Sequence, residues 1–116
     1  VNPNNIDVYA RLNALKKSVS SDDIACFIGS ARSKVFVESL YTLAQYADCT
    51  ATRKEFLDSI YENFGSTETS FWRSRDGLLQ FGLINIDHTG EMSISLTERG
   101  AKFTLRILQA VNNMLS

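Results

Sequence analysis

Proline occurs once in this chain, at position 3, and glycine occurs only six times in 116 residues. Both residue types interrupt regular backbone, so the long stretches between them are free to form helices. Apolar residues make up 44% of the chain and charged residues 22%, a balance that excludes a disordered chain and is typical of one globular domain. We therefore expect a single, mainly helical domain over residues 1–116.

Apolar residues at intervals of three and four predict a series of helices separated by polar caps. Thr52, with Glu55 three residues later, has the pattern of a capping box, and Gly65 suits the left-handed end of the helix that Thr52 opens. The helices expected in chain order are one ending near residue 19, a short one at 24–28, and longer ones at about 31–47, 52–65, 67–82 and 97–116.

After Gly82 the pattern changes from the period of a helix to that of a strand. Residues 83–86 are apolar and β-branched, residues 88–90 have the composition of a turn, and residues 92–96 alternate apolar with serine. This pattern predicts a β-hairpin with one buried face. Thr97 is placed to cap the last helix, and Gly100, a poor helix former, predicts a close approach of another backbone.

Two short strings resemble those of a known fold. Residues 78–84, Leu-Leu-Gln-Phe-Gly-Leu-Ile, resemble the end of a winged-helix recognition helix, and residues 96–100, Leu-Thr-Glu-Arg-Gly, resemble the string that closes the wing. Both recur in the MarR and PadR families of bacterial regulators, and the resemblance covers about residues 31–105. It implies a mainly α fold with a small β-hairpin: a winged helix-turn-helix core at 31–97, an N-terminal helical extension at 1–28 and a C-terminal helix at 98–116.

The resemblance implies sequence-specific binding of double-stranded DNA by a homodimeric transcriptional regulator. In the expected recognition helix, Phe71 and Leu78 share one face and the polar residues lie on the other, which would enter the major groove. The residues expected to read bases are Thr69, Ser70, Arg73 and Gln80. Phosphate contacts are expected from cations and capping residues at the starts of helices. The residues expected to make them are Arg32, Lys34, Thr52, Arg53, Lys54 and Thr67. The turn between the two strands is the expected wing, with His88 and Thr89.

A narrow apolar stripe in the first helix and a broad apolar surface on the last helix predict the dimer interface. A two-fold dimer would present two recognition helices ~34 Å apart, matching a pseudo-palindromic site. The residues expected in this interface are Val8, Leu12, Leu15, Val19, Leu105, Leu108, Val111 and Leu115.

Other readings of the same residues stay open. The net charge is −1, and the wing turn is flanked by Asp87 and Glu91, neither of which favours DNA. Leu79 and Phe81 stand where charged residues are usual. These features favour a winged helix that acts as a protein–protein adaptor, and the polar face of the recognition helix is then an ordinary solvated face. A DNA-binding plasmid or phage partition or replication protein would use the same contacts as a regulator.

Enzymatic, metal-dependent and membrane functions are not expected. The chain has one histidine, no glycine-rich phosphate loop, no nucleophile elbow and no apolar run long enough to span a bilayer. With one histidine and two cysteines it lacks the ligands for a four-coordinate zinc site, and no cofactor is expected. We expect a reduced, cytoplasmic setting, associated with the nucleoid when bound to DNA, with Cys26 buried and Cys49 the more reactive thiol.

Overall fold

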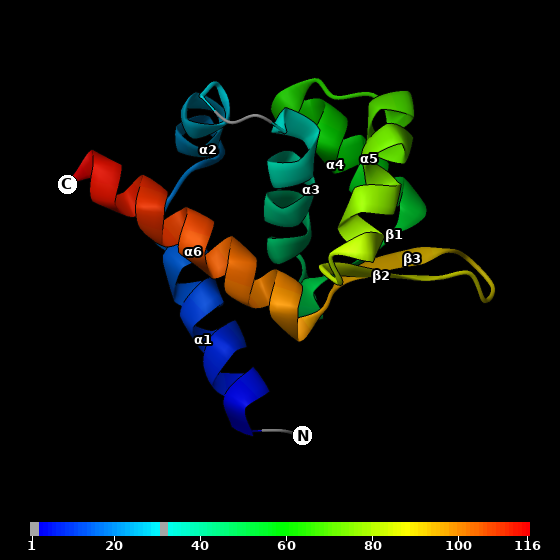
Figure 1. Ribbon diagram of the computed structural model, residues 1–116, viewed down its shortest axis with the longest axis horizontal. Coiled ribbons are helices and arrows are strands. Elements are labelled where there is room, and N and C mark those ends of the chain that lie inside the picture. The colour runs from blue at the N-terminus through cyan, green and yellow to red at the C-terminus, as the bar shows by residue number, and fades with distance from the viewer. Residues whose placement is uncertain (1–2, 31–32) are drawn as a thin grey trace.

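The computed structural model describes residues 3–30 and 33–116. Within them the chain is mainly helical, with one small antiparallel sheet (Figure 1), as the sequence predicts. The elements in chain order are α1 (Pro3–Ser18), α2 (Ser21–Ile28), α3 (Lys34–Ala44), the 3₁₀ turn η1 (Ala47–Cys49), β1 (Thr50–Thr52), α4 (Arg53–Phe64), α5 (Glu68–Gln80), β2 (Ile84–Asp87), β3 (Ser93–Leu96) and α6 (Glu98–Leu115).

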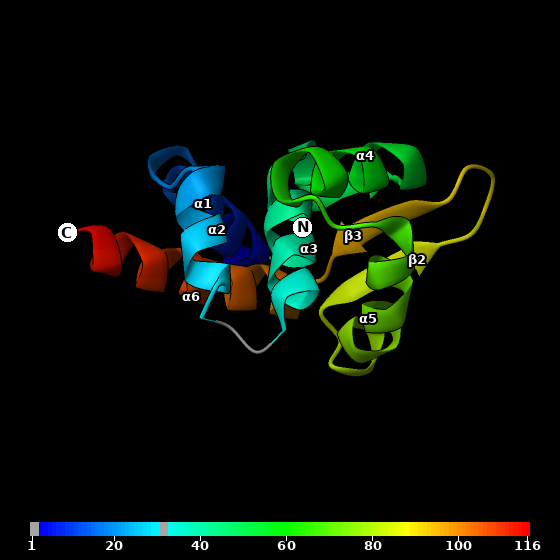
Figure 2. The same cartoon turned by 90° about the horizontal axis from the view of Figure 1, so that it is seen from above.

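Helix α3 stands in the middle of the molecule. Both views show α1, α2 and most of α6 on one side of it, and α4, α5 and the sheet on the other (Figures 1 and 2). Eight consecutive residues of α3, from 37 to 44, are buried, because neighbours cover every side of the helix. The core therefore runs through α3 and joins the two halves of the fold.

The predicted caps are present. Thr52 accepts a hydrogen bond from the Glu55 backbone while the Glu55 side chain accepts from the Thr52 backbone, so the capping box that opens α4 is confirmed. Gly65 closes α4 in the left-handed conformation, at φ 73°. Thr67 and Thr97 cap α5 and α6 through their hydroxyl oxygens. Local polar chemistry thus sets the start of each of these three helices.

The sheet has one strand more than the sequence predicts. Its strand order is β1-β3-β2, with β3 paired antiparallel to both neighbours. The predicted hairpin is confirmed as β2 and β3, while β1 was missed because three residues carry too little alternation to reveal a strand. The backbone N–H of Arg53 donates to the Met92 carbonyl at 2.8 Å, which ties the start of α4 to the hairpin.

The predicted dimer interface is wrong for most of its residues. Helix α1 lies along α6 in the same chain (Figure 1), and the two apolar stripes pack against each other and the core. Leu15 is half-buried and Leu115, near the end of α6, is 56% exposed. The other six residues are at most 6% exposed, so they stabilise the monomer and offer no surface to a second copy: Val8, Leu12, Val19, Leu105, Leu108 and Val111.

The expected helix at 31–47 is shorter than predicted. It is α3, which ends at Ala44 and is followed by η1, where Asp48 and Cys49 adopt positive φ values of 56° and 53°. The left-handed backbone turns the chain directly into β1 and buries Cys49. The expected roles of the two cysteines are therefore reversed: Cys26 is exposed on α2, and burial raises the pKa of the Cys49 thiol.

Candidate nucleic-acid interface

Helix α5 has one buried face and one open face. Phe71 and Leu78 are fully buried against the core. The ring of Phe71 meets that of Phe56 in α4 at a centroid distance of 4.7 Å. The opposite face carries only polar and charged side chains, all exposed: Thr69, Arg73, Asp76 and Gln80. The division between faces is the one that the sequence predicts, and three of the four residues expected to read bases are accessible from one side.

The start of α5 is fastened to the start of α4 by Trp72. Its indole N–H donates to the Glu68 carboxylate at 2.9 Å, and the guanidinium groups of Arg53 and Arg75 lie 5.9 and 5.2 Å from the ring centroid. Arg53 also forms an ion pair with Glu68. The side chain of Trp72 is half-buried and packs against the core. We call the group of Trp72, Glu68, Arg53 and Arg75 the Trp72 clamp. Its contacts hold the first turns of α4 and α5 together.

Two arginines near the start of α5 already have partners in this clamp. Arg53, predicted to contact phosphate, already has Glu68 and Trp72 as partners. Arg75 forms an ion pair with Asp76, at 3.4 Å. Arg73 and Lys54 are exposed, and neither has an ion pair within residues 3–30 and 33–116. Arg73 and Lys54 are therefore the cations of this surface that can contact a phosphate or a base.

Three of the predicted polar contacts are used locally. The hydroxyl oxygens of Thr52 and Thr67 accept backbone hydrogen bonds as helix caps, from Glu55 and Ser70 respectively. The Ser70 hydroxyl lies 3.1 Å from that of Thr67. A cap hydroxyl can still approach a phosphate, because the free N–H groups of the first turn point the same way. Thr69, by contrast, is exposed in the first turn of α5.

Of two further predicted phosphate contacts, Arg32 lies outside the described residues. Lys34, the first residue of α3, is exposed, and its Nζ lies 3.8 Å from Oε2 of the buried Glu38. Lys34 is thus an exposed cation that is already paired with a buried carboxylate.

The hairpin tip is acidic. His88 and Thr89 are exposed, as expected of a wing. Hydrogen bonds from the Thr89 hydroxyl and backbone N–H to Asp87 Oδ1, at 2.6 and 2.9 Å, lower the pKa of Asp87. Asp87 therefore stays ionised at neutral pH, and Glu91 is exposed nearby in the chain. The hairpin extends beyond the helices (Figure 1), but its charge is unfavourable for phosphate.

Glu38 has a positioning role that the sequence interpretation missed. It lies in the buried stretch of α3 and its side chain is fully buried, where it accepts a hydrogen bond from the Ser66 hydroxyl in the turn between α4 and α5. Burial raises the pKa of Glu38, against the smaller opposing effects of Ser66 and Lys34. The carboxyl group holds the turn that leads into α5. The sequence feature that could have revealed this role is a glutamate within the mostly apolar segment Val-Phe-Val-Glu-Ser-Leu at 35–40.

No group of histidine, cysteine, aspartate and glutamate side chains that could hold a metal ion occurs among the described residues. None of the described helices is long and apolar enough to cross a membrane. No protein-family model, curated protein or solved structure matches the chain.

Proposed function

We propose that the chain is a winged-helix protein that binds double-stranded DNA, with α5 as the recognition helix. The element order from α3 to α6, with a three-stranded sheet whose last two strands form a hairpin, supports a winged helix-turn-helix. The strings at 78–84 and 96–100 fall around the end of α5 and the start of α6, and these positions support the resemblance to MarR and PadR regulators. Control of transcription in the cytoplasm is the role that we infer for such a module.

One observation carries the proposal: the outward face of α5 is exposed and carries the polar side chains of Thr69, Arg73, Asp76 and Gln80, with no apolar residue among them. A helix enters the major groove, about 12 Å wide, and polar side chains on its groove-facing side can bond to base edges. Arg73 lies at the centre of that face and is suited to a bidentate contact with guanine. Gln80 is suited to adenine. Lys54, in the first turn of α4, would contact the backbone.

The testing experiment is a fluorescence-anisotropy titration of the full chain with a labelled random-sequence duplex at several salt concentrations. Each phosphate neutralised by a cation contributes about −0.9 to the slope of log affinity against log salt. With few unpaired cations, we expect a shallow slope of about −2 to −4. Selection of bound duplexes from a random pool then gives the preferred sequence. Absence of binding at low salt would contradict the proposal.

The runner-up function is protein–protein contact as an adaptor, and a specific observation favours it. Helix α5 carries the carboxylates of Glu68 and Asp76 beside its cations, and the hairpin carries those of Asp87 and Glu91. At the end of α5, Leu79 and Phe81 are 40% and 57% exposed. Acidic surroundings oppose phosphate binding, and exposed apolar side chains favour a protein partner. The same titration separates the two functions. A role in plasmid or phage partition or replication would give the same titration result as transcription control.

A further inference from the structure

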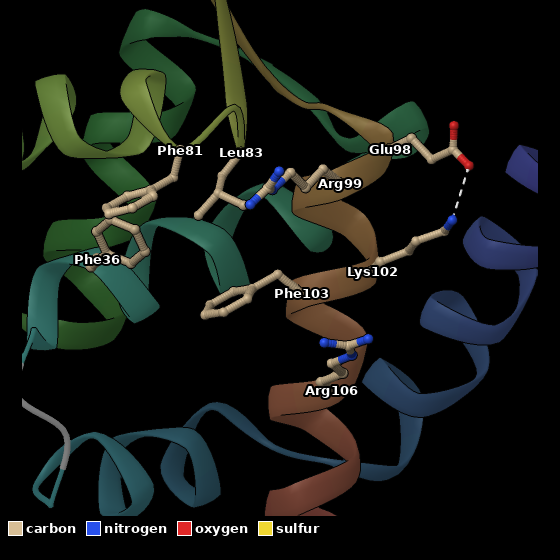
Figure 3. Close-up of a pocket in the computed structure, with 8 residues that line it drawn as sticks. All are labelled: Phe36, Phe81, Leu83, Glu98, Arg99, Lys102, Phe103 and Arg106. Carbon is tan, nitrogen blue, oxygen red and sulfur yellow. Dashed lines mark ion pairs between the residues drawn. The ribbon is translucent and has the colours of Figure 1, made fainter.

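An aromatic pocket opens where α3, the end of α5, the start of β2 and α6 meet (Figure 3). Its volume is about 670 Å³. The Phe36 ring makes edge contacts with Phe81 and Phe103, at centroid distances of 6.3 and 6.5 Å. Phe81 is 57% exposed and Phe103 is 40% exposed. A cluster of aromatic rings left open to water is an unsatisfied apolar surface of the kind that receives another apolar group.

Cations of α6 border the pocket. Arg99, Lys102 and Arg106 are spaced so that they share an arc of the helix with Phe103. Glu98, the sole acidic residue of α6, pairs with Lys102 at 3.4 Å, and both side chains point away from the aromatic rings (Figure 3). Arg99 extends toward Leu83 at the pocket wall. Within the part of the chain that the structure describes, neither Arg99 nor Arg106 has an ion pair, so the rim carries uncompensated positive charge.

Helix α4 of the same chain carries an exposed aromatic residue with acidic neighbours, a group complementary to this pocket. Tyr61 is 62% exposed, more than any other described aromatic side chain. Asp58 and Glu62, also exposed, fall within the same arc of about 100° of the helix surface. From Glu55 to Phe64 this helix has three acidic residues and no basic one. Tyr61 is therefore an aromatic group flanked by negative charge, and the pocket is an aromatic surface flanked by positive charge.

We propose that Tyr61 of one copy of this chain docks in the aromatic pocket of a second copy, with Asp58 and Glu62 paired to Arg99 and Arg106. Charge complementarity selects this occupant: the net charge is only −1, yet residues 55–64 of α4 include acidic residues and no basic one, whereas Arg99, Lys102 and Arg106 border the pocket on α6. A buried aromatic anchor ringed by polar pairs is the usual composition of an interaction hot spot. The contact uses neither of the apolar stripes of α1 and α6.

The two surfaces lie on different sides of the molecule, α4 on the far side of α3 from most of α6 (Figure 2). One copy therefore offers its Tyr61 and its pocket to two different neighbours, a heterologous contact that forms rings or open chains of molecules. If the proposed DNA binding holds, neighbouring copies related in this way would read sites repeated in the same direction. The association itself does not depend on DNA.

Sedimentation velocity of the full chain without DNA tests the proposal. At low salt we expect concentration-dependent species heavier than the 13.0 kDa monomer. These should dissociate as the screening length falls from ~30 Å at 0.01 M to ~3 Å at 1 M salt. Tyr61→Ala and Arg106→Glu should each give monomers, with unchanged circular dichroism. Lys17→Glu, a charge reversal on the exposed side of α1, should leave association intact.

Mixing two variants gives the sharper result. Tyr61→Ala removes the anchor of the contact and Arg106→Glu damages the pocket side, so each variant alone should be monomeric. Mixed together, the intact pocket of the first variant and the intact Tyr61 of the second should form a 1:1 complex that stops at the dimer. A monomeric wild-type chain at low salt would overturn the proposal, as would association that persists in Tyr61→Ala and Arg106→Glu. A mixture that stays monomeric would overturn it as well.

Discussion

Gly100 and Leu83 approach so closely that a Cβ atom on Gly100 would lie 1.9 Å from the Leu83 carbonyl oxygen. The same carbonyl accepts a hydrogen bond from the Thr97 backbone N–H at 3.0 Å. Residue 100 must therefore be glycine for α6 to begin where it does, directly against the start of β2. The close backbone approach predicted from a glycine three residues into a helix is confirmed.

Replacing Gly100 with alanine should separate α6 from β2 and reduce the free energy of unfolding by about 3 kcal/mol, at the upper end of overpacking effects. Urea denaturation followed by circular dichroism measures the loss. Gly77→Ala is the matched control, since its Cβ would lie 3.7 Å from a ring carbon of Phe36, an ordinary contact. Alanine there should raise stability by about 0.5–1 kcal/mol, as in other helices. Equal effects at the two positions would contradict the role given to Gly100.

Thr97 closes the hairpin and opens α6 with one hydroxyl group, which donates to the Gly82 carbonyl and accepts from the Gly100 backbone N–H at 2.9 Å. Thr97→Ala removes both bonds and should cost about 1–2 kcal/mol of unfolding free energy. Thr97→Ser retains the hydroxyl and should stay within about 0.5 kcal/mol of the wild type. Thermal denaturation of the three proteins at one pH is the measurement. A serine variant as unstable as the alanine variant would show that the methyl group, not the hydroxyl, matters.

Replacing Glu38 with glutamine should stabilise the protein at neutral pH. Burial raises the pKa of Glu38 above its ordinary value of 4.5, so in the pH range between the two values the folded state binds more protons than the unfolded state. Stability from this group is therefore lost as the pH rises through that range. Glutamine cannot ionise, and its amide oxygen can still accept from Ser66.

Denaturation curves from pH 4 to pH 8 check this prediction. Glu38→Gln should flatten the fall in stability above pH 4.5, while Glu62→Gln, an exposed matched control, should leave the wild-type slope unchanged. A glutamine variant less stable than the wild type at pH 7 would show that the ion pair with Lys34 outweighs the burial of the charge.

Replacing Arg73 with alanine should weaken DNA binding to the preferred sequence by about 1–3 kcal/mol and relax the choice of base at one position. Lys54→Ala should weaken all sequences alike and reduce the salt slope by about 1, because it removes a phosphate contact. Anisotropy titrations with preferred and random duplexes measure both effects. Arg11→Ala, on the exposed side of α1, is the control. Unchanged sequence preference in the Arg73 variant would contradict its place in base reading.

The two thiols should differ strongly in reactivity. Cys26 is exposed, whereas Cys49 is buried and its pKa is raised, which reduces the thiolate fraction at neutral pH. A disulfide reagent at neutral pH should modify one thiol quickly and the second only after denaturant is added. Cys26→Ser should abolish the fast reaction, and Cys49→Ser should preserve it. Fast modification in the Cys26→Ser protein would indicate that η1 opens readily.

The sequence was most informative where a local interaction decides the structure. Thr52 with Glu55, and Gly65, each act over a few residues, so their roles could be predicted from spacing alone. Gly100 was predicted to allow a close approach because it suits a helix poorly, but its partner, Leu83, is distant in the chain and could not be named from the sequence. The apolar stripes of α1 and α6 were equally clear as stripes. Their partner was assigned wrongly, because periodicity shows that a face is apolar but not whether the surface that covers it belongs to the same chain.

The electrostatics of the α5 surface could be predicted only in part. Its open face follows from the helical period, but the clamp of Trp72 between Arg53 and Arg75 depends on how α4 and α5 cross. The same holds for Glu38 and Ser66, which are 28 residues apart in the chain. The strand β1 is likewise defined by its pairing with β3, and its three residues carry no pattern of their own.

Strand β3 lies between β1 and β2, and these strands adjoin three different helices. Four residues therefore connect the first turn of α4, the exit from α5 and the first turn of α6. Because the three strands are hydrogen-bonded to one another, these helix ends cannot move apart without breaking hydrogen bonds of the sheet. The small sheet therefore holds the ends of three helices, α5 among them, in one arrangement.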